Sequence, residues 1–137
     1  MKLTEICEIE RVKKDKLYPK DTILIQVSAT QGDTILLEEA QECESKYVAL
    51  TPKIDYEPVF LFESIKLSMD SFLERYKAGP NIQVEAFKFF DVKMVPIKKQ
   101  RQIAITIKIY DLLYKKWEKI IELEKDLKKN MLDSMFV

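Results

Sequence analysis

The chain has 137 residues, of which 47% are apolar and 34% charged, and its 23 Lys and Arg residues equal its 23 Asp and Glu residues in number. The length suits one domain or one small domain with an arm, and zero net charge argues against a protein that coats nucleic acid indiscriminately, while leaving room for a local basic face. The sequence contains no His, which excludes Ser-His-Asp and Cys-His catalysis and removes the commonest zinc ligand.

The first part of the sequence predicts short strands and turns after a brief opening helix. Residues 3–9 carry apolar side chains at helical spacing, which indicates a short helix. The Tyr-Pro-Lys-Asp sequence of residues 18–21 is typical of a turn. Residues 22–28 are β-branched and alternating and predict a strand, and residues 34–37 predict its hairpin partner after a turn at 30–33.

The middle of the sequence predicts one more strand and a longer helix. Residues 47–51 have the composition of a short strand. A helix is expected to start at Asp55 or Tyr56, with Pro58 in its first turn, where a missing N–H does no harm, and to run to about Tyr76. The Ala-Gly-Pro-Asn sequence of residues 78–81 then breaks the chain.

Three phenylalanines and a last strand complete the expected domain. Phe87, Phe89 and Phe90 are expected in the core, and residues 92–97 are expected to form the final strand. Residues 1–97 therefore predict one α+β (mixed α/β) domain of strands and short helices.

Residues 98–137 predict one long amphipathic helix. No Pro or Gly interrupts the segment, and apolar residues recur at steps of three and four. At about 1.5 Å per residue, residues 98–133 form a rod of about 54 Å. The preceding domain has an expected radius of gyration of roughly 12–13 Å, so the rod is longer than that domain can cover.

The apolar stripe of this helix therefore needs a second helix, from another copy or from another protein. The alternative is that the stripe folds back on its own domain, which could cover only the first half of the helix. The predicted interface consists of Leu113, Trp117, Ile120, Leu123, Leu127 and Met131.

The location of the protein is also predicted by composition. The longest apolar runs, such as residues 59–62, are far shorter than the ~20 residues that span a bilayer, and acids occupy the start of the chain, where a signal peptide is apolar. Cys7 and Cys43 form no CxxC pair. We therefore expect a cytoplasmic protein with no membrane partner and two reduced thiols.

One pattern resembles a nuclease site. Asp33, followed by Glu44 and Lys46, could hold a magnesium ion and a water for phosphodiester cleavage. In a chain with 34% charged residues such a short pattern arises easily by chance, so a solvated loop is the expected reading.

Several segments, in the same order, resemble one family. They are residues 2–9 (KLTEICEI), 18–25 with 28–32, 47–52, 79–83 with Phe87 and 92–97, and 100–103 (QRQI) at the helix entrance. Together they resemble one target-recognition domain and its spacer helix from the DNA-specificity subunits of type I restriction–modification systems. The chain departs from the family in having Lys99 where an acid usually precedes Gln100, and in having one domain and one spacer helix where a full subunit has two of each.

The resemblance implies a recognition subunit that performs no chemistry and needs no cofactor or metal. In this family each recognition domain reads half of a bipartite DNA site, the spacer helices pack antiparallel, and methyltransferase subunits dock around the assembly. A single-domain chain is then expected to form a homodimer through an antiparallel coiled coil and to read a palindromic bipartite site, because protein symmetry is mirrored in the DNA.

The resemblance also names the expected partners, which are double-stranded DNA, a second copy of the chain and type I methyltransferase subunits. Base reading needs hydrogen-bonding side chains on rigid loops, and phosphate binding needs cations. The candidates for DNA contact are Arg11, Lys13, Lys14, Lys16, Lys20, Thr30, Gln31, Lys46, Lys77, Asn81 and Gln83.

A second function remains open from the sequence. The chain could be an interaction or decoy protein that keeps the helical arm and occupies methyltransferase or full-length specificity subunits without reading DNA. The zero net charge and the small domain favour this alternative slightly.

Overall fold

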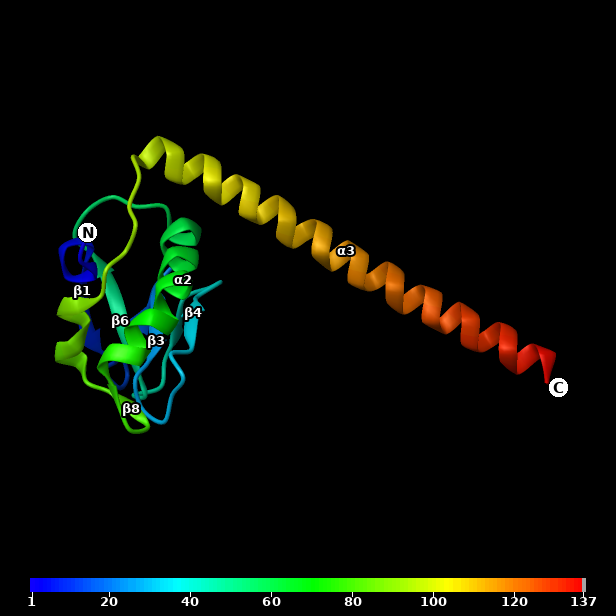
Figure 1. Ribbon diagram of the computed structural model, residues 1–137, viewed down its shortest axis with the longest axis horizontal. Helices are drawn as coiled ribbons and strands as arrows, with labels where there is room; N and C mark the ends of the chain where they lie inside the picture. Colours follow the sequence, from blue (N-terminus) through cyan, green and yellow to red (C-terminus); the bar gives the residue numbers. More distant parts are fainter. Residues whose placement is uncertain (137) are drawn as a thin grey trace. The chain divides into compact units, whose positions relative to one another are not determined.

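The computed structural model describes residues 1–136, whose backbone divides into two compact units, Met1–Arg101 and a second from Gln102 onward. The first unit is an α+β domain built on a four-stranded antiparallel sheet of order β1-β6-β3-β4 (Figure 1). The strands of this sheet are β1 (Cys7–Arg11), β3 (Ile23–Gln26), β4 (Thr34–Leu36) and β6 (Tyr47–Pro52).

Short strand pairs and helices surround this sheet. The strand pairs are β2 (Leu17–Tyr18) with β5 (Gln41–Glu42), and β7 (Lys77–Ala78) with β8 (Asn81–Ile82). The helices of this first unit are α1 (Leu3–Ile6), α2 (Pro58–Tyr76) and the 3₁₀ helix η1 (Val84–Phe89). Helix α3 (Ile97–Met135) starts at the end of the first unit and continues as the second. The expected α+β class and the long C-terminal helix are thereby confirmed.

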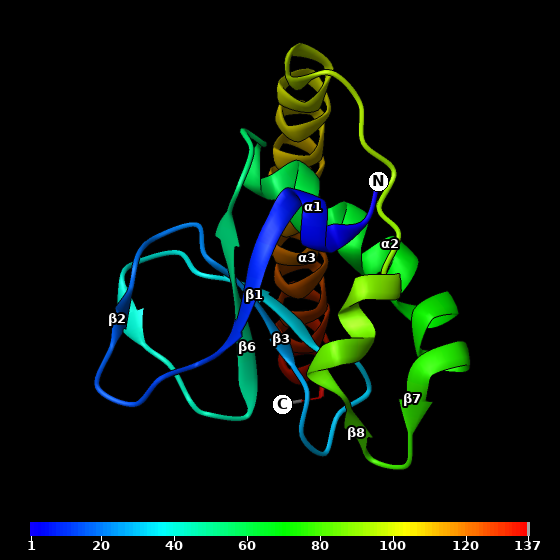
Figure 2. The same ribbon diagram turned by 90° about the vertical axis from the view of Figure 1, so that its left-hand side faces the viewer.

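The sheet is buried on both faces because side chains alternate along its central strands. Ile23 and Ile25 of β3 lie in the main core, whereas Leu24 between them lies in a second, smaller cluster. Helix α2 contributes Leu61 and Ile65 to the main core. The lobe formed by β2 and β5 covers the other face of the sheet (Figure 2).

Helix α2 begins two or three residues later than the sequence predicted and ends where expected. Pro58 takes the first helical position, and the carboxylate of Glu57 accepts a hydrogen bond from the Phe60 N–H at 2.7 Å. This cap satisfies one of the backbone donors that a helix start leaves without a partner. The strands predicted at residues 22–28, 34–37 and 47–51 are also confirmed, with the β3–β4 hairpin in the predicted pairing.

The opening segment differs from the prediction. Helix α1 stops at Ile6, and Cys7 begins strand β1, which pairs with β6 along its whole length. Cys7 and Ile9, assigned to a helix from their spacing, are strand residues. The alternation of Cys-Glu-Ile-Glu also fits a strand, and pairing with the neighbouring β6 favours the strand over the helix.

Phe89 was wrongly assigned to the core. Phe87 and Phe90 are buried, but Phe89 is 45% exposed. In a 3₁₀ helix, residues three apart lie on the same side, so Phe87 and Phe90 share the buried side and Phe89 lies off it. Phe89 instead stacks on the ring of Tyr76, with centroids 5.1 Å apart.

The strand predicted at residues 92–97 is also wrong. The only ladder contact near it, within the described chain, is an isolated bridge between Lys2 and Asp91. The Met1 carbonyl accepts from Val92 N–H, and the remainder of the segment leads directly into α3. A β-branched run without an adjacent strand edge has no partner for a ladder.

Gln100 fixes the first turn of α3 to the domain. Its side chain is buried, its Oε1 accepts from the Glu57 N–H at 3.0 Å, and its Nε2 donates to the Val95 carbonyl at 2.8 Å. The glutamine at the helix entrance, one of the residues that carries the family likeness, therefore joins two segments of the domain.

Both cysteines are free, as expected. Burial raises the pKa of the Cys7 thiol to about 11, despite the opposing effect of a hydrogen bond with Tyr56. This thiol is therefore protonated and unreactive at neutral pH. No helix in residues 1–136 combines the length and the apolar character that a bilayer crossing needs.

Gly32 is the position where the hairpin turn depends most on the absence of a side chain. Its φ is +86°, and a Cβ built there would lie 2.6 Å from Met69 Cγ of α2. Gly79 has a similar φ of +67°, but a Cβ there would meet nothing within 4 Å. We expect Gly32→Ala to lower the free energy of unfolding by about 2–4 kcal/mol and Gly79→Ala by only about 1 kcal/mol.

Urea denaturation of the two variants and the wild type measures this difference. Equal losses in both variants would mean that backbone strain alone governs Gly32 and that the turn does not pack closely on α2.

Candidate nucleic-acid interface

Loops from separate parts of the sequence meet at one end of the four-stranded sheet, which we call the loop edge. Here β1 ends at Arg11, β6 begins at Tyr47, and β3 turns into β4 (Figure 2). Backbone hydrogen bonds join these loops, from Val27 N–H to the Lys46 carbonyl and from Ile82 N–H to the Val27 carbonyl, both at 2.8 Å. The loop edge is thus a hydrogen-bonded unit and not a set of independent loops.

Arg11 links two of these loops. Its Nη2 donates to Ser28 Oγ at 2.8 Å and its Nε donates to the Ser45 carbonyl at 3.1 Å. The side chain is nevertheless exposed, so the guanidinium both orders the loops and presents a positive charge. Ser28 and Ser45 were not among the predicted contacts, because their importance arises only from this long-range contact.

Thr30 and Asn81 position the hairpin loop. Thr30 is 4% exposed, and its hydroxyl oxygen accepts from Gly32 N–H at 2.8 Å. Asn81 Oδ1 accepts from the Ala29 N–H at 2.9 Å, across to the β7–β8 hairpin. Ala29 has a φ of +47°, a left-handed conformation that needs such support. These two residues, which were predicted to contact DNA, therefore stabilise the conformation of the loop.

Gln31 and Lys46 are better placed to meet another molecule. Gln31 lies at the tip of the β3–β4 turn and is exposed. Lys46 is half-buried, with its ammonium 3.5 Å from Glu44 Oε2 and 5.3 Å from the centre of the Tyr47 ring. An exposed amide on a fixed turn has the donor and acceptor groups that base edges require.

The basic run after Arg11 forms the loop between β1 and β2, at the same end of the sheet (Figure 2). Glu10 lies between two of its members, 3.0 Å from Lys16 and 3.9 Å from Lys13. The hydrogen bond from Lys16 lowers the pKa of the Glu10 carboxyl and raises that of Lys16. Lys14 is exposed in the turn of this loop.

The remaining predicted contacts lie on two other segments. Lys20 belongs to the turn before β3, at the opposite end of that strand from Gln26 and the loop edge. Lys77 begins β7, where it is half-buried and pairs with Ile82, and Gln83 directly follows β8. This hairpin is bonded to the loop edge through Ile82. The structure thus divides the predicted set, and the loop edge with its adjoining β1–β2 loop holds most of it.

The nuclease-like residues also lie at the loop edge. Asp33 follows the β3–β4 turn, and Glu44 is ion-paired with Lys46. Among the residues that the structure describes, no group of three or more His, Cys, Asp or Glu side chains is arranged to hold a metal ion.

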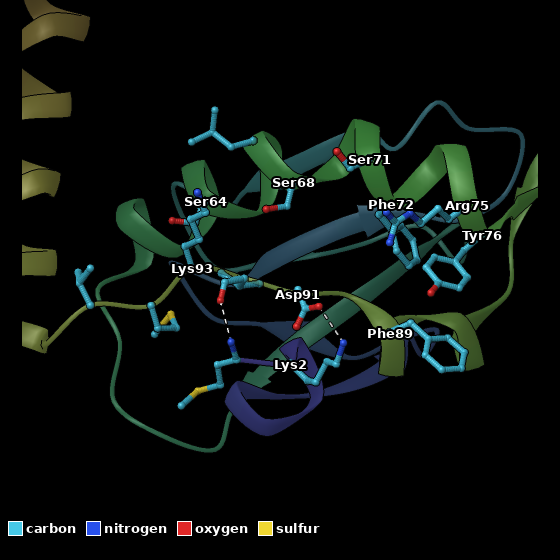
Figure 3. A pocket seen from close by; sticks show the side chains of 15 residues that line it. Lys2, Ser64, Ser68, Ser71, Phe72, Arg75, Tyr76, Phe89, Asp91 and Lys93 are labelled. Carbon is cyan, nitrogen blue, oxygen red and sulfur yellow. Dashed lines mark hydrogen bonds and ion pairs between the residues drawn. The ribbon is translucent and has the colours of Figure 1, made fainter.

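A groove of about 1100 Å³ lies between α2 and the segments that carry Lys2 and residues 89–95 (Figure 3). Ser64, Ser68 and Arg75 line it from the helix, and the ion pair between Lys2 and Asp91, at 2.8 Å, lies across from them. None of the predicted DNA-contact residues is among its lining residues within the described chain. The groove is therefore separate from the loop edge.

The second unit carries the predicted interface. Helix α3 has 39 residues and is continuous from Ile97 to Met135. The six side chains of the predicted interface are between 46% and 63% exposed, an unusual level for so many large apolar residues in one stripe.

A model of the type I restriction modification DNA specificity domain matches residues 6–125 of the chain. The chain belongs to this family. The matched segment includes the whole loop edge and most of α3, and it confirms the resemblance inferred from the sequence. The family is one of non-catalytic DNA recognition, so the role of the chain is that of a specificity subunit in a type I restriction–modification system. No curated protein matches the chain.

The hydrogen bond from the Ala29 N–H to Asn81 Oδ1 can be tested directly. We expect Asn81→Ala to accelerate hydrogen exchange of the Ala29 amide roughly tenfold, because the acceptor of its hydrogen bond is removed. NMR measures the exchange amide by amide. Asn81→Asp keeps an oxygen at the same place and should preserve most of the protection, so equal acceleration in both variants would refute this role.

Proposed function

We propose that this specificity-domain chain works as a homodimer whose two copies pair antiparallel through α3. Each copy reads one half of a palindromic bipartite DNA site, and the dimer directs methyltransferase and restriction subunits to that site. The observation that carries the proposal is the exposed apolar stripe on a 39-residue helix, in a chain whose family recognises DNA.

The dimer is supported by the chemistry of the stripe. Large apolar side chains recur along it at coiled-coil spacing, from Leu113 through Trp117 and Ile120 to Leu127. Burying apolar surface is worth about 25 cal/mol per Å², so several half-exposed Leu, Ile and Trp side chains supply a strong drive for pairing. Trp117 is the expected anchor, since Trp is enriched among interface hot spots.

The DNA surface that we propose is the loop edge with the β1–β2 loop. Gln31 is the candidate for base contact, and Arg11, Lys14 and Lys46 are the candidates for phosphates. Hydrogen bonds between the loops order the backbone at the loop edge and hold the Arg11 side chain, which lowers the entropy cost of binding. Thr30 and Asn81 act through the loop that they hold.

A second candidate function is a decoy that binds specificity-system partners through α3 without reading DNA. The ion pairs of Lys16 with Glu10 and of Lys46 with Glu44 favour it, because they neutralise part of the basic surface. Capture of a methyltransferase subunit by a chain with no DNA affinity would support the decoy and contradict the proposed DNA reading.

The first test is the mass in solution. We expect light scattering to give a dimer for the wild type and a folded monomer for Trp117→Asp with Leu127→Asp. The substitutions place two further carboxylates from each copy in the helix–helix interface, which we call the seam, and desolvating them costs more free energy than pairing supplies. Circular dichroism checks that the domain of the double variant remains folded.

The matched control is Lys115→Asp with Lys129→Asp, which adds at least as much negative charge on the opposite side of α3. This variant should remain a dimer. A monomeric wild type, or equal dissociation in both variants, would contradict the proposed helix–helix interface.

The second test measures binding to a duplex selected from random sequences, which should contain an inverted repeat. We expect Lys14→Ala to reduce the slope of log K against log salt concentration by about two, since the dimer loses one phosphate contact in each copy and each contact contributes about 0.9. Fluorescence anisotropy at several salt concentrations gives this slope.

Lys20→Ala provides the control, because it removes the same charge at the opposite end of β3. It should leave the slope unchanged. Equal effects of the two substitutions, or a selected site without twofold symmetry, would count against the proposed surface or the proposed dimer respectively.

A further inference from the structure

One charged residue lies in the centre of the apolar stripe of α3. Glu124 stands seven residues after Trp117 and seven before Met131, with Ile120 and Leu127 one turn to either side. At about 100° per residue it lies about 20° around the helix axis from Leu113. The helix is continuous here, so no kink turns Glu124 away from the stripe.

We propose that Glu124 determines the direction in which two copies of α3 pair, by excluding the parallel dimer. The proposal rests on the homodimer proposed above. In a parallel, in-register pair each seam residue faces its own copy, so two Glu124 carboxylates would meet in a seam from which water is largely removed. Like charges in such a place repel and both lose their hydration.

Antiparallel pairing removes this conflict and supplies an opposite charge. In an antiparallel pair centred near Ile120, position 124 of one copy comes alongside position 116 of the other, because each lies four residues from the centre. Position 116 is Lys, about 60° from Leu113 around the axis and thus at the border of the stripe. A long Lys side chain at such a border reaches across apolar neighbours to a carboxylate.

The same alignment keeps the apolar residues together. Leu113 of one copy comes opposite Leu127 of the other, and Ile109 opposite Met131. The second copy is therefore the occupant that the stripe fits in both polarity and charge. A single polar residue at a core position that fixes coiled-coil pairing at some cost in stability is a known device.

The test reads helix direction through a disulfide. Ser134 lies near the C-terminal end of the seam, so in a parallel dimer the two copies of position 134 face each other, whereas in the antiparallel pair position 134 comes opposite Thr106. The background is Cys43→Ser with Ser134→Cys, and Cys7 is left in place because it is buried. Cross-linked dimer is quantified on a non-reducing gel after equilibration in a glutathione buffer.

We expect little cross-linking with Glu124 present, and a rise of roughly tenfold or more when Glu124→Leu is added, since losing the like-charge conflict admits the parallel pair. Glu122→Leu is the matched control, because Glu122 lies on the opposite face of the helix, about 180° from Leu113. It should leave the cross-linked fraction unchanged.

The mass of each variant, measured by light scattering under reducing conditions, separates the possible failures. A dimer that cross-links equally with Glu124 or with Leu at that position overturns the role of Glu124 and leaves the homodimer standing. A monomer for every variant overturns the homodimer and, with it, the proposal for Glu124.

Discussion

The central strands of the sheet are buried on both faces, and this constraint decides which parts of the domain can recognise a ligand. In β6, Val48 and Leu50 face the main core while Ala49 faces the smaller cluster under the β2–β5 lobe. An alternating strand covered on both sides has no side chain left for DNA. The loops at the strand ends, whose hydrogen-bonding side chains have no core to enter, are therefore the surface that we propose for recognition.

The loops at that end are stiffened by contacts that no single loop could make. Arg11 bonds to two of them, and the backbone of Val27 bonds to a third at the β8 strand. Their charges are partly compensated by exposed ion pairs such as Lys16 with Glu10. Exposed pairs of this kind are worth about 0–1 kcal/mol, so a phosphate can replace the carboxylate at little cost. A surface of this kind favours selective recognition over indiscriminate attraction to DNA.

The sequence predicted the elements whose signal is local and long. Strand β3, its hairpin partner, α2 and α3 follow from periodicity and from Pro and Gly at their ends. The wrong predictions concern segments whose structure depends on a partner that is distant in the sequence. Residues 7–11 form a strand because β6 lies beside them. Residues 92–97 form no ladder because no strand edge lies beside them. The candidate site shows the same limit, since polar loop residues were found by type but the bonds of Thr30, Asn81 and Ser28 depend on tertiary contact.

The apolar stripe of α3 combines a strong drive for pairing with one charged residue, Glu124, that opposes burial. An uninterrupted apolar stripe would pair in either direction. The recognition domain is joined to the N-terminal end of α3, so direction decides whether two domains lie at the same end of the paired helices or at opposite ends. A helix of 39 residues is about 58 Å long, which exceeds one turn of DNA at about 34–36 Å. In the proposed homodimer, only the antiparallel pair separates the two domains by such a length, as the proposed reading of two halves of one site requires, and a single carboxylate in the seam is a small loss of stability for that separation.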